Sequence, residues 1–101
     1  MRLEKLARNQ PCYLRLPTIC NGNSETTVLC HIRRGNVGGT SIKPSPVCAV
    51  PMCFDCHNAY DSRTRTSYSR DELDSEALRA LVQWLDYLWR HEYLILGGIT
   101  A

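Results

Sequence analysis

The most regular pattern of apolar and polar positions lies in the last third of the chain. Over residues 71–95, apolar side chains recur at intervals of three and four residues, which is the spacing of one face of an α-helix. The members of this apolar stripe are Leu78, Leu81, Val82, Leu85, Leu88 and Trp89. Asp71 and Asp74 suit the start of the helix, and Gly97-Gly98 is expected to end it. Because most amphipathic helices of this length cover a core, we expect the stripe to pack inward; a dimer seam is the alternative.

Shorter apolar segments precede this helix. Thr26–Ile32 and Val47–Met52 are rich in β-branched and apolar residues, and they predict two short strands that pair with each other. Upstream of the first strand, Cys12–Cys20 predicts an extended knuckle and a turn. Short helices are expected over Arg2–Asn9 and from about His57 to Tyr60. This order of elements is typical of a small α+β domain.

The composition indicates that the small core of this chain needs a disulfide or a bound metal to stabilise it. The chain has 101 residues, which is the size of one domain with a small core, and its six cysteines point to disulfides or a metal. The first ten residues lack the apolar run of a secretory signal, and no stretch reaches the roughly 18 apolar residues of a membrane span. We therefore expect a cytoplasmic protein without membrane contact. In that compartment cysteine clusters more often bind metal than form disulfides.

Charge is divided unevenly between the two halves of the chain. Residues 1–48 contain seven lysines and arginines against two acidic residues, whereas residues 49–101 contain five arginines against eight acidic residues. The formal net charge of +2 is therefore the remainder of a basic half and an acidic half. Such asymmetry suits a polyanionic partner on one face, and a solvated surface with chance clustering is the alternative.

Four cysteines have the spacing of a structural zinc site. Cys53 and Cys56 form a Cys-x2-Cys knuckle, in which two thiolates can bind one ion from a tight turn. Cys12 and Cys20 form a second, looser pair upstream. Four thiolates satisfy a tetrahedral zinc ion, which would join the N-terminal segment to the helix after the strands. The alternative is that Cys12 or Cys20 is an ordinary buried thiol.

A second set of ligand types begins directly after this knuckle. If His57 opens a helix, Asp61 lies one turn later on the same face, and both side chains can reach one cation. A histidine with a carboxylate suits Mg²⁺, Mn²⁺ or Zn²⁺ with open positions for water and phosphate. His31 ends the first predicted strand, and strand pairing can bring it opposite this helix face. The alternative is that His57 and Asp61 only cap and end a helical turn.

The ordered motifs of residues 12–61 resemble the HNH (His-Me finger, ββα-metal) endonucleases, whose pattern runs Asp-His-Ile, Gly-Gly and Cys-x2-Cys-His. The matching motifs here are Cys30-His31-Ile32-Arg33-Arg34, Gly38-Gly39 and Cys53-Phe54-Asp55-Cys56-His57. More closely, most of the chain resembles the prophage-encoded YbcO-type nucleases, which are related to the RecA-dependent phage nuclease Ref. This closer likeness includes Gln10-Pro11-Cys12, Arg15-Leu16-Pro17, Cys20, Glu25-Thr26-Thr27-Val28-Leu29 and His31-Ile32-Arg33.

The resemblance implies a role for each matching residue. His31 corresponds to a general base that deprotonates water for attack on a phosphodiester, and imidazole suits this task because its pKa lies near neutrality. His57 and Asp61 correspond to the ligands of one divalent ion, Mg²⁺, Mn²⁺, Ni²⁺ or Zn²⁺, which would stabilise charge on the phosphate and the leaving oxygen. The four knuckle cysteines would form a separate structural zinc site. The arginines expected to contact DNA phosphates are Arg33, Arg34, Arg63 and Arg65.

Two cysteines stand where the wider HNH pattern has other residues. Cys30 precedes the base histidine, where an aspartate or histidine often binds the metal, and Cys48 stands near the position of an asparagine that orients the base. A thiolate at Cys30 suits a soft metal and suits Mg²⁺ poorly. Because a free cysteine packs as a small apolar residue, we expect both to be buried on the strands.

Together these inferences predict one HNH-like α+β nuclease domain over residues 1–101. Its ββα-metal, treble-clef-like core would span residues 12–61 and hold structural zinc, with the long C-terminal helix packed over it. The expected function is that of a prophage-derived, metal-dependent DNA endonuclease, monomeric or homodimeric, with a recombinase filament as a further candidate partner. The alternative is a non-catalytic zinc-binding module that binds DNA or a protein. A redox switch at Cys53 and Cys56 is disfavoured, since the zinc site uses both.

Overall fold

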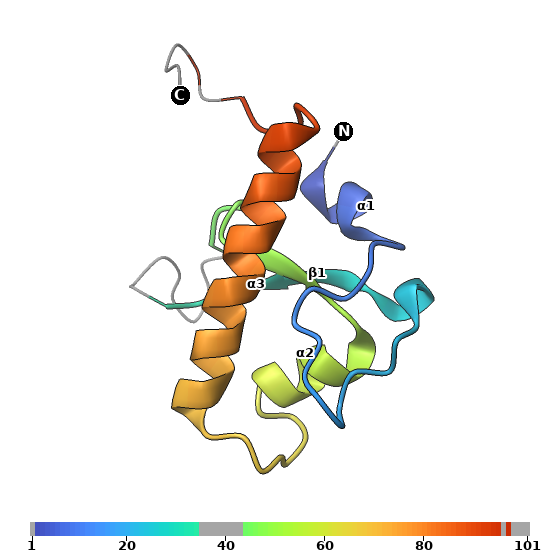
Figure 1. The fold of residues 1–101 in the computed structure, drawn as a ribbon, viewed down its shortest axis with the longest axis vertical. Helices are drawn as coiled ribbons and strands as arrows, with labels where there is room; N and C mark the ends of the chain where they lie inside the picture. Colours follow the sequence, from blue (N-terminus) through green and yellow to red (C-terminus); the bar gives the residue numbers. More distant parts are fainter. Residues whose placement is uncertain (1, 35–43, 96, 98–101) are drawn as a thin grey trace.

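A computed structural model describes residues 2–34, 44–95 and 97, and Figure 1 shows how its elements are arranged. In chain order they are α1 (Leu3–Ala7), the 3-10 helix η1 (Ser24–Thr26), β1 (Val28–His31), β2 (Ala49–Met52), α2 (Phe54–Tyr60) and α3 (Arg70–Arg90). The strands cross near the middle of α3, with α1 beside the C-terminal end of that helix and α2 beside its N-terminal end. The predicted small α+β fold with a long C-terminal helix is confirmed. The expected Gly38-Gly39 loop lies outside the described residues.

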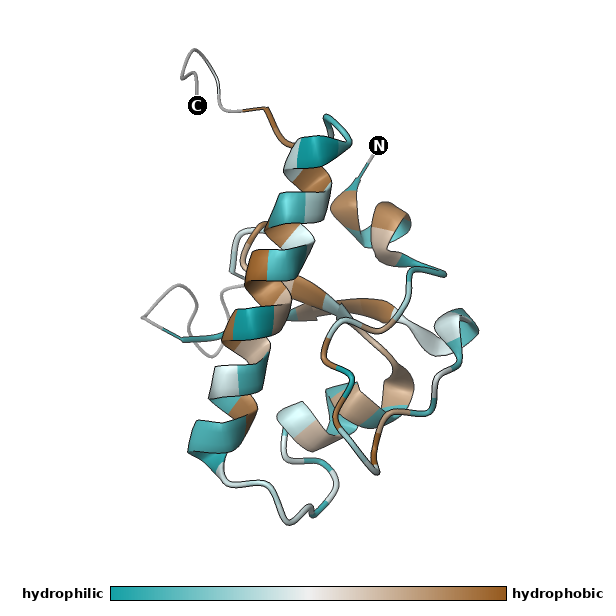
Figure 2. Ribbon diagram, viewed as in Figure 1, coloured by the Kyte–Doolittle hydropathy of each residue, from teal (hydrophilic) through white to brown (hydrophobic). Residues whose placement is uncertain are grey.

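The sheet has two antiparallel strands. Its register pairs Val28 with Met52, Leu29 with Pro51, Cys30 with Val50 and His31 with Ala49. The strands are shorter than the predicted Thr26–Ile32 and Val47–Met52, because turns at Ser24–Thr26 and Ser45–Cys48 take up their ends. In Figure 2 the strands and α1 are mainly apolar, whereas polar and apolar bands alternate along α3. All four residues of β2 are buried, and α3 packs against this strand.

α3 packs on the sheet with a different face from the one that the apolar spacing indicated. The side chains that it buries are Leu73, Ala77, Ala80, Trp84 and Leu88. Leu78 and Val82 are 63% and 58% exposed, and Trp89 is exposed as well. The prediction that the whole stripe packs inward is therefore wrong. The buried residues recur at intervals of three and four themselves, so they form a helix face of their own, and the stripe left out its small members Ala77 and Ala80.

α3 ends at Arg90 and not near residue 95. Glu92 has a left-handed conformation with a φ of 60°, which interrupts an α-helix. The amides of Glu92 and Tyr93 donate to carbonyls of the last helical turn at 3.1 and 2.9 Å. These are the two hydrogen bonds of a Schellman motif, so Glu92 closes the helix. The predicted stop at Gly97-Gly98 is thus wrong, and Gly98 itself lies outside the described residues.

The segment Cys12–Cys20 is a loop and contains no strand. Positive φ angles of 46° at Arg15 and 68° at Thr18 prevent a continuous extended run. Leu14 is fully buried, and its carbonyl accepts a hydrogen bond from Arg79 of α3 at 2.7 Å. Buried side chains and α3 therefore hold this loop in place.

α2 begins at Phe54, three residues before the predicted start at His57. Cys53 caps it, because the Sγ atom of Cys53 accepts a hydrogen bond from the amide of Cys56 at 3.4 Å. The whole knuckle therefore belongs to the helix start. None of the helices in the described part of the chain is long and apolar enough to cross a membrane.

Candidate functional site

Four cysteines from separate parts of the chain converge at the start of α2. Their sulfur atoms all lie within 4.8 Å of one another, and three of the four residues are buried. The loop before η1 supplies Cys12 and Cys20, while Cys53 and Cys56 come from the N-cap and first turn of α2. We call these residues the four-cysteine cluster. All six cysteines of the chain carry free thiols, so each sulfur of the cluster is available as a ligand.

The cluster has dimensions that fit a tetrahedral zinc ion. Zn–S bonds of about 2.3 Å separate neighbouring sulfurs by about 3.8 Å, and the Sγ atoms of Cys20 and Cys53 are 3.9 Å apart. A disulfide would require about 2.05 Å. The amides of Arg15 and Cys56 donate to the sulfurs of Cys12 and Cys53 at 3.4 Å each. Amides aimed at sulfur stabilise thiolate charge, so the four cysteines could hold a structural metal such as zinc.

Hydrogen bonding within the cluster already favours a thiolate. A hydrogen bond from the Cys56 thiol lowers the pKa of Cys12 to about 4, although burial acts in the opposite direction. The same hydrogen bond, with burial, raises the pKa of Cys56 far above its usual range. Two adjacent thiolates repel each other, so a cation between the two sulfurs would stabilise the charged form of both.

A second group of metal-ligand types joins β1 to α2. Cys30, His57 and Asp61 each offer one ligand atom, and these three atoms lie within 4.8 Å of one another. The Nε2 atom of His57 and the Oδ2 atom of Asp61 are 2.9 Å apart, in keeping with their one-turn spacing in the sequence. Cys30 is 1% exposed, whereas the side chains of His57 and Asp61 are 24% and 30% exposed. This Cys–His–Asp group is therefore buried at its sulfur and open at its other two donors.

Burial and a negative neighbour act together on the sulfur of this group. Burial, followed by the charge of Asp61, raises the pKa of the Cys30 thiol well above its usual range, and nearby arginines oppose this only in part. The expectation that Cys30 is buried on a strand is thus confirmed. Its place within a metal-ligand group is a finding that burial alone did not predict.

His31 lies near the Cys–His–Asp group without being one of its members. It lines, together with Asp61, an open pocket of about 160 Å³. The other residues around this pocket are Arg33, Arg34, Tyr60, Ser62 and Arg70. We call it the arginine pocket, since three of its seven lining residues are arginines. The expected general base, one expected metal ligand and two expected phosphate contacts therefore line the same pocket.

Tyr60 and Asp74 hold two of these arginines. The guanidinium carbons of Arg34 and Arg70 lie 5.3 and 5.0 Å from the ring centre of Tyr60, within the range of cation–π attraction. Arg34 pairs with Asp74 at 3.1 Å, and Arg70 donates to the carbonyl of Tyr60 at 2.6 Å. Burial raises the pKa of Tyr60 to about 12, so its phenol is neutral at physiological pH. The pocket therefore has a fixed positive wall.

The loop between α2 and α3 carries the other two predicted phosphate contacts. Arg63 is exposed and lies 3.9 Å from Asp61, at the edge of the arginine pocket. Arg65 lines two neighbouring surface pockets and is not among the residues that surround the arginine pocket. Arg70, which no motif indicated, lies there instead. The signal that could have found Arg70 is its position directly after this basic loop, at the first residue of α3.

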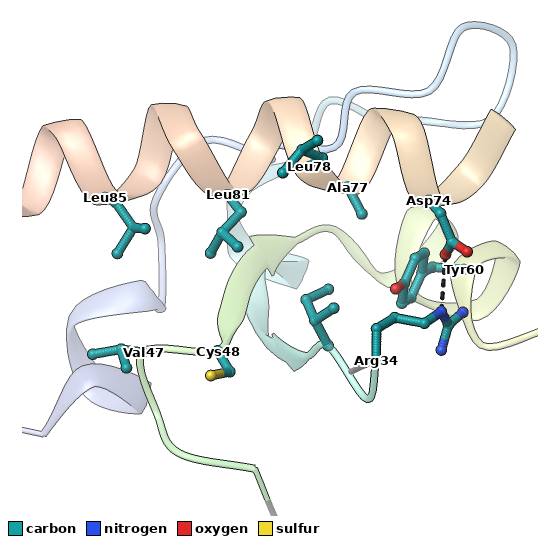
Figure 3. Close-up of a pocket in the computed structure, with 10 residues that line it drawn as sticks. Arg34, Val47, Cys48, Tyr60, Asp74, Ala77, Leu78, Leu81 and Leu85 are labelled. Atoms are coloured by element: carbon teal, nitrogen blue, oxygen red, sulfur yellow. Dashed lines mark hydrogen bonds and ion pairs between the residues drawn. The ribbon is translucent and has the colours of Figure 1, made fainter. Parts of the chain in front are cut away.

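The expectation that Cys48 is buried on a strand is wrong, because the turn Ser45–Cys48 places it just before β2 with a half-buried side chain. This side chain lines an apolar groove of about 670 Å³. Figure 3 shows Leu81 and Leu85 of α3 on one side of this groove, and Val47 and Cys48 on the other. The side chain of Arg34 marks its far end. Among the described residues, Cys48 belongs to neither metal-ligand group.

Known proteins match the part of the chain that contains the four-cysteine cluster and the Cys–His–Asp group. A family model described as "Putative nuclease YbcO" matches residues 1–87. The chain is 40% identical over 86 residues to "Putative nuclease YbcO" of Escherichia coli (strain K12), covering 82% of this chain and 90% of that protein. The same values hold for "Putative nuclease ybcO" of Enterobacteria phage 82. A solved structure, "Structure of a putative bacteriophage protein from Escherichia coli str. K-12 substr. MG1655", is similar with a TM-score of 0.74 and 30% identity, covering 89% of this chain and 99% of that one.

Proposed function

The chain belongs to the "Putative nuclease YbcO" family, and on that premise we propose that it is a metal-dependent DNA endonuclease that hydrolyses phosphodiester bonds. One observation carries the proposal: His31, Asp61 and three arginines surround one pocket, and His57 lies 2.9 Å from Asp61 at its edge. Phosphodiester hydrolysis needs a base, a metal site and positive charge around the phosphate, and these residues supply candidates for all three.

Each residue of the site has one task in this proposal. His31 takes the proton from the attacking water, which requires an imidazole near the metal that is not itself a ligand. His57 and Asp61 hold one divalent ion, Mg²⁺, Mn²⁺, Ni²⁺ or Zn²⁺. When bound, that ion supplies Lewis-acid stabilisation of charge on the phosphate and the leaving oxygen. The arginines of the pocket, with Arg63, bind adjacent phosphates, and Arg65 contacts DNA farther along the strand.

The order β1, β2, α2 supports assignment to the HNH, or ββα-metal, endonucleases with a treble-clef-like zinc site. In this assignment β1 carries the base at its end, and α2 carries the ligands His57 and Asp61 one turn apart. The four-cysteine cluster holds a structural zinc ion at the start of α2. That ion would fix the direction of α2 and, with it, the position of His57 relative to His31.

Substitution of the proposed base tests the function. Cleavage of supercoiled plasmid and single-stranded DNA is measured with each of the four ions, and His31→Ala should lower the rate about 10²- to 10⁴-fold. The matched control is His91→Ala, because His91 caps the far end of α3 and is exposed. Zinc content and the thermal melt should be unchanged in both variants. Full cleavage by His31→Ala would remove the proposed role of His31.

A non-catalytic zinc-binding module is the second candidate function. It is favoured by the sulfur of Cys30, which occupies a place in the Cys–His–Asp group where an oxygen ligand would suit Mg²⁺ better. Such a module would bind DNA or a protein, and no divalent ion would produce nicking. DNA binding would then fall with rising salt as phosphate contacts are screened, and His31→Ala would leave it unchanged.

The proposed substrate is DNA in the cytoplasm, and two further partners are open to test. The proposed state in solution is a monomer or a homodimer. The homodimer is included because Leu78 and Val82 are exposed on α3 and could pack against a second copy of the chain. Analytical ultracentrifugation distinguishes the two. A recombinase filament as a co-substrate is tested by comparing cleavage of naked and filament-coated single strands.

A further inference from the structure

We propose that Cys30 is a third ligand of the ion held by His57 and Asp61, and that its sulfur makes the site select Zn²⁺ and other thiophilic divalent ions over Mg²⁺. This inference rests on the proposed function, because it concerns the same metal site. It adds a ligand and the chemical class of the ion.

Neighbouring elements hold the three side chains against one another. Cys30 lies opposite Val50 of β2, and β2 passes into α2 through the N-cap Cys53. α2 then carries His57, and Asp61 follows one turn later at its C-cap. The distance from the sulfur to the two other donors is therefore set by a strand pairing and a short helix. A structural metal at Cys53 would fix that junction further.

The spacing of the donor atoms fits one ion. Bonds of about 2.1 Å to nitrogen and oxygen and about 2.3 Å to sulfur place tetrahedral donors about 3.3–3.6 Å apart. The Nε2 atom of His57 and the Oδ2 atom of Asp61 are 2.9 Å apart, and the sulfur of Cys30 lies within 4.8 Å of both. The side chains of His57 and Asp61 are partly exposed, so both would have room to adjust their torsion angles around a bound ion.

This donor set differs from that of a magnesium site. Mg²⁺ prefers oxygen donors in near-octahedral geometry, whereas thiolate and imidazole ligands suit Zn²⁺ and its first-row neighbours. Three protein ligands leave a fourth position open, as in catalytic zinc sites. Asp61 also lines the arginine pocket, so an ion on this carboxylate would adjoin that pocket.

The surroundings of Cys30 are unusual for a cysteine that only fills space. Such a residue behaves as a small apolar side chain, yet Cys30 has a carboxylate and an imidazole within 4.8 Å of its sulfur. Toward the described residues, its own thiol makes a long contact of 3.8 Å to the carbonyl of His31. A dication would bind sulfur and carboxylate at once, with the thiol proton released to water.

Cobalt absorption tests the assignment, because a thiolate ligand gives Co²⁺ a charge-transfer band that nitrogen and oxygen ligands do not. The four-cysteine cluster of the full chain is first filled with one equivalent of Zn²⁺, and Co²⁺ is then added. We expect the wild-type protein to bind one further equivalent with a sulfur-to-cobalt band. Cys30→Ser should lose the band, and its affinity should fall by more than the roughly 10- to 100-fold caused by loss of an outer-shell partner. Cys48→Ser, a matched control, should retain both.

Cys30→Asp provides the complementary variant. It places oxygen where the wild-type protein has sulfur, so competition experiments should show the preference moving from Zn²⁺ toward Mg²⁺ and Mn²⁺. Circular dichroism and retention of one tightly bound zinc ion verify that each variant folds. If the variants of Cys30 do not fold, the spectrum of the wild-type protein decides the assignment by itself.

The outcomes separate this inference from the proposed function. A second equivalent of Co²⁺ that binds without a sulfur band, or a band that persists in Cys30→Ser, overturns the role of Cys30 and leaves the His57–Asp61 site standing. Failure to bind any second ion overturns both. Binding with the expected band but without DNA cleavage supports the ligand set and counts against the nuclease.

Discussion

Removal of metal from the four-cysteine cluster should unfold the whole domain. A domain of this size has a free energy of unfolding of about 5–15 kcal/mol. Structural zinc in small domains binds with about 10–16 kcal/mol at neutral pH. The two quantities are of the same size, so the bound ion would account for most of the net stability of the chain.

The position of the cluster explains why the effect would not be local. Cys12, Cys53 and Cys56 belong to the same buried core cluster as Leu14 and Val50. Within the described part of the chain the sheet has two strands, and a two-stranded sheet is marginal by itself. Without the ion, the core would contain clustered thiols in place of a crosslink between the N-terminal loop and α2.

Cys20→Ser and Cys48→Ser form a matched pair for the assay. A quarter of the binding energy of the ion is about 2.5–4 kcal/mol, which corresponds to a loss of at least about 10 °C in Tm. Cys20→Ser should show this loss in circular dichroism, together with loss of tightly bound zinc. Cys48→Ser should stay within about 8 °C of the wild type, since it removes no ligand. A chelator-treated wild-type protein that melts cooperatively at an unchanged Tm would refute the reasoning.

Three further substitutions test the packing around the site. Tyr60→Phe should change the free energy of unfolding by less than about 1 kcal/mol, because the buried hydroxyl has no hydrogen-bond partner among the described residues; a larger loss in urea denaturation would contradict this. Ser69→Ala should cost about 1 kcal/mol, because it removes the capping box of α3. Hydrogen bonds to Ser69 also lower the pKa of Glu72, so the capping box stabilises the protein fully above the usual glutamate pKa and loses this effect as the pH falls through the lowered pKa. The difference in stability between Ser69→Ala and the wild type should therefore shrink in acid. Arg79→Met should cost about 2 kcal/mol, because the guanidinium holds two carbonyls of the loop 12–20, and an unchanged Tm in calorimetry would exclude this.

The parts of the candidate site that are close together in the chain could be predicted from the sequence. His57 and Asp61 are one helical turn apart, and Cys53 and Cys56 form one knuckle, so local backbone geometry sets both distances. The helix over most of α3 was predictable for the same reason, because its spacing is a local property. The resemblance to known nucleases added residues that are distant in the chain, such as His31.

Which distant side chains meet, and which face of a helix is buried, depends on how the elements pack in three dimensions. Arg70 lines the arginine pocket, whereas Arg65 does not. The path of the loop between α2 and α3 sets this difference, and no sequence motif encodes that path. The strand register brings the sulfur of Cys30 within 4.8 Å of donor atoms of His57 and Asp61. α3 carries two neighbouring sets of apolar residues with helical spacing, and spacing by itself does not say which set meets the sheet. The packing of α3 on β2 buries the set that includes Ala77 and Ala80, so Leu78 and other large apolar residues stay exposed.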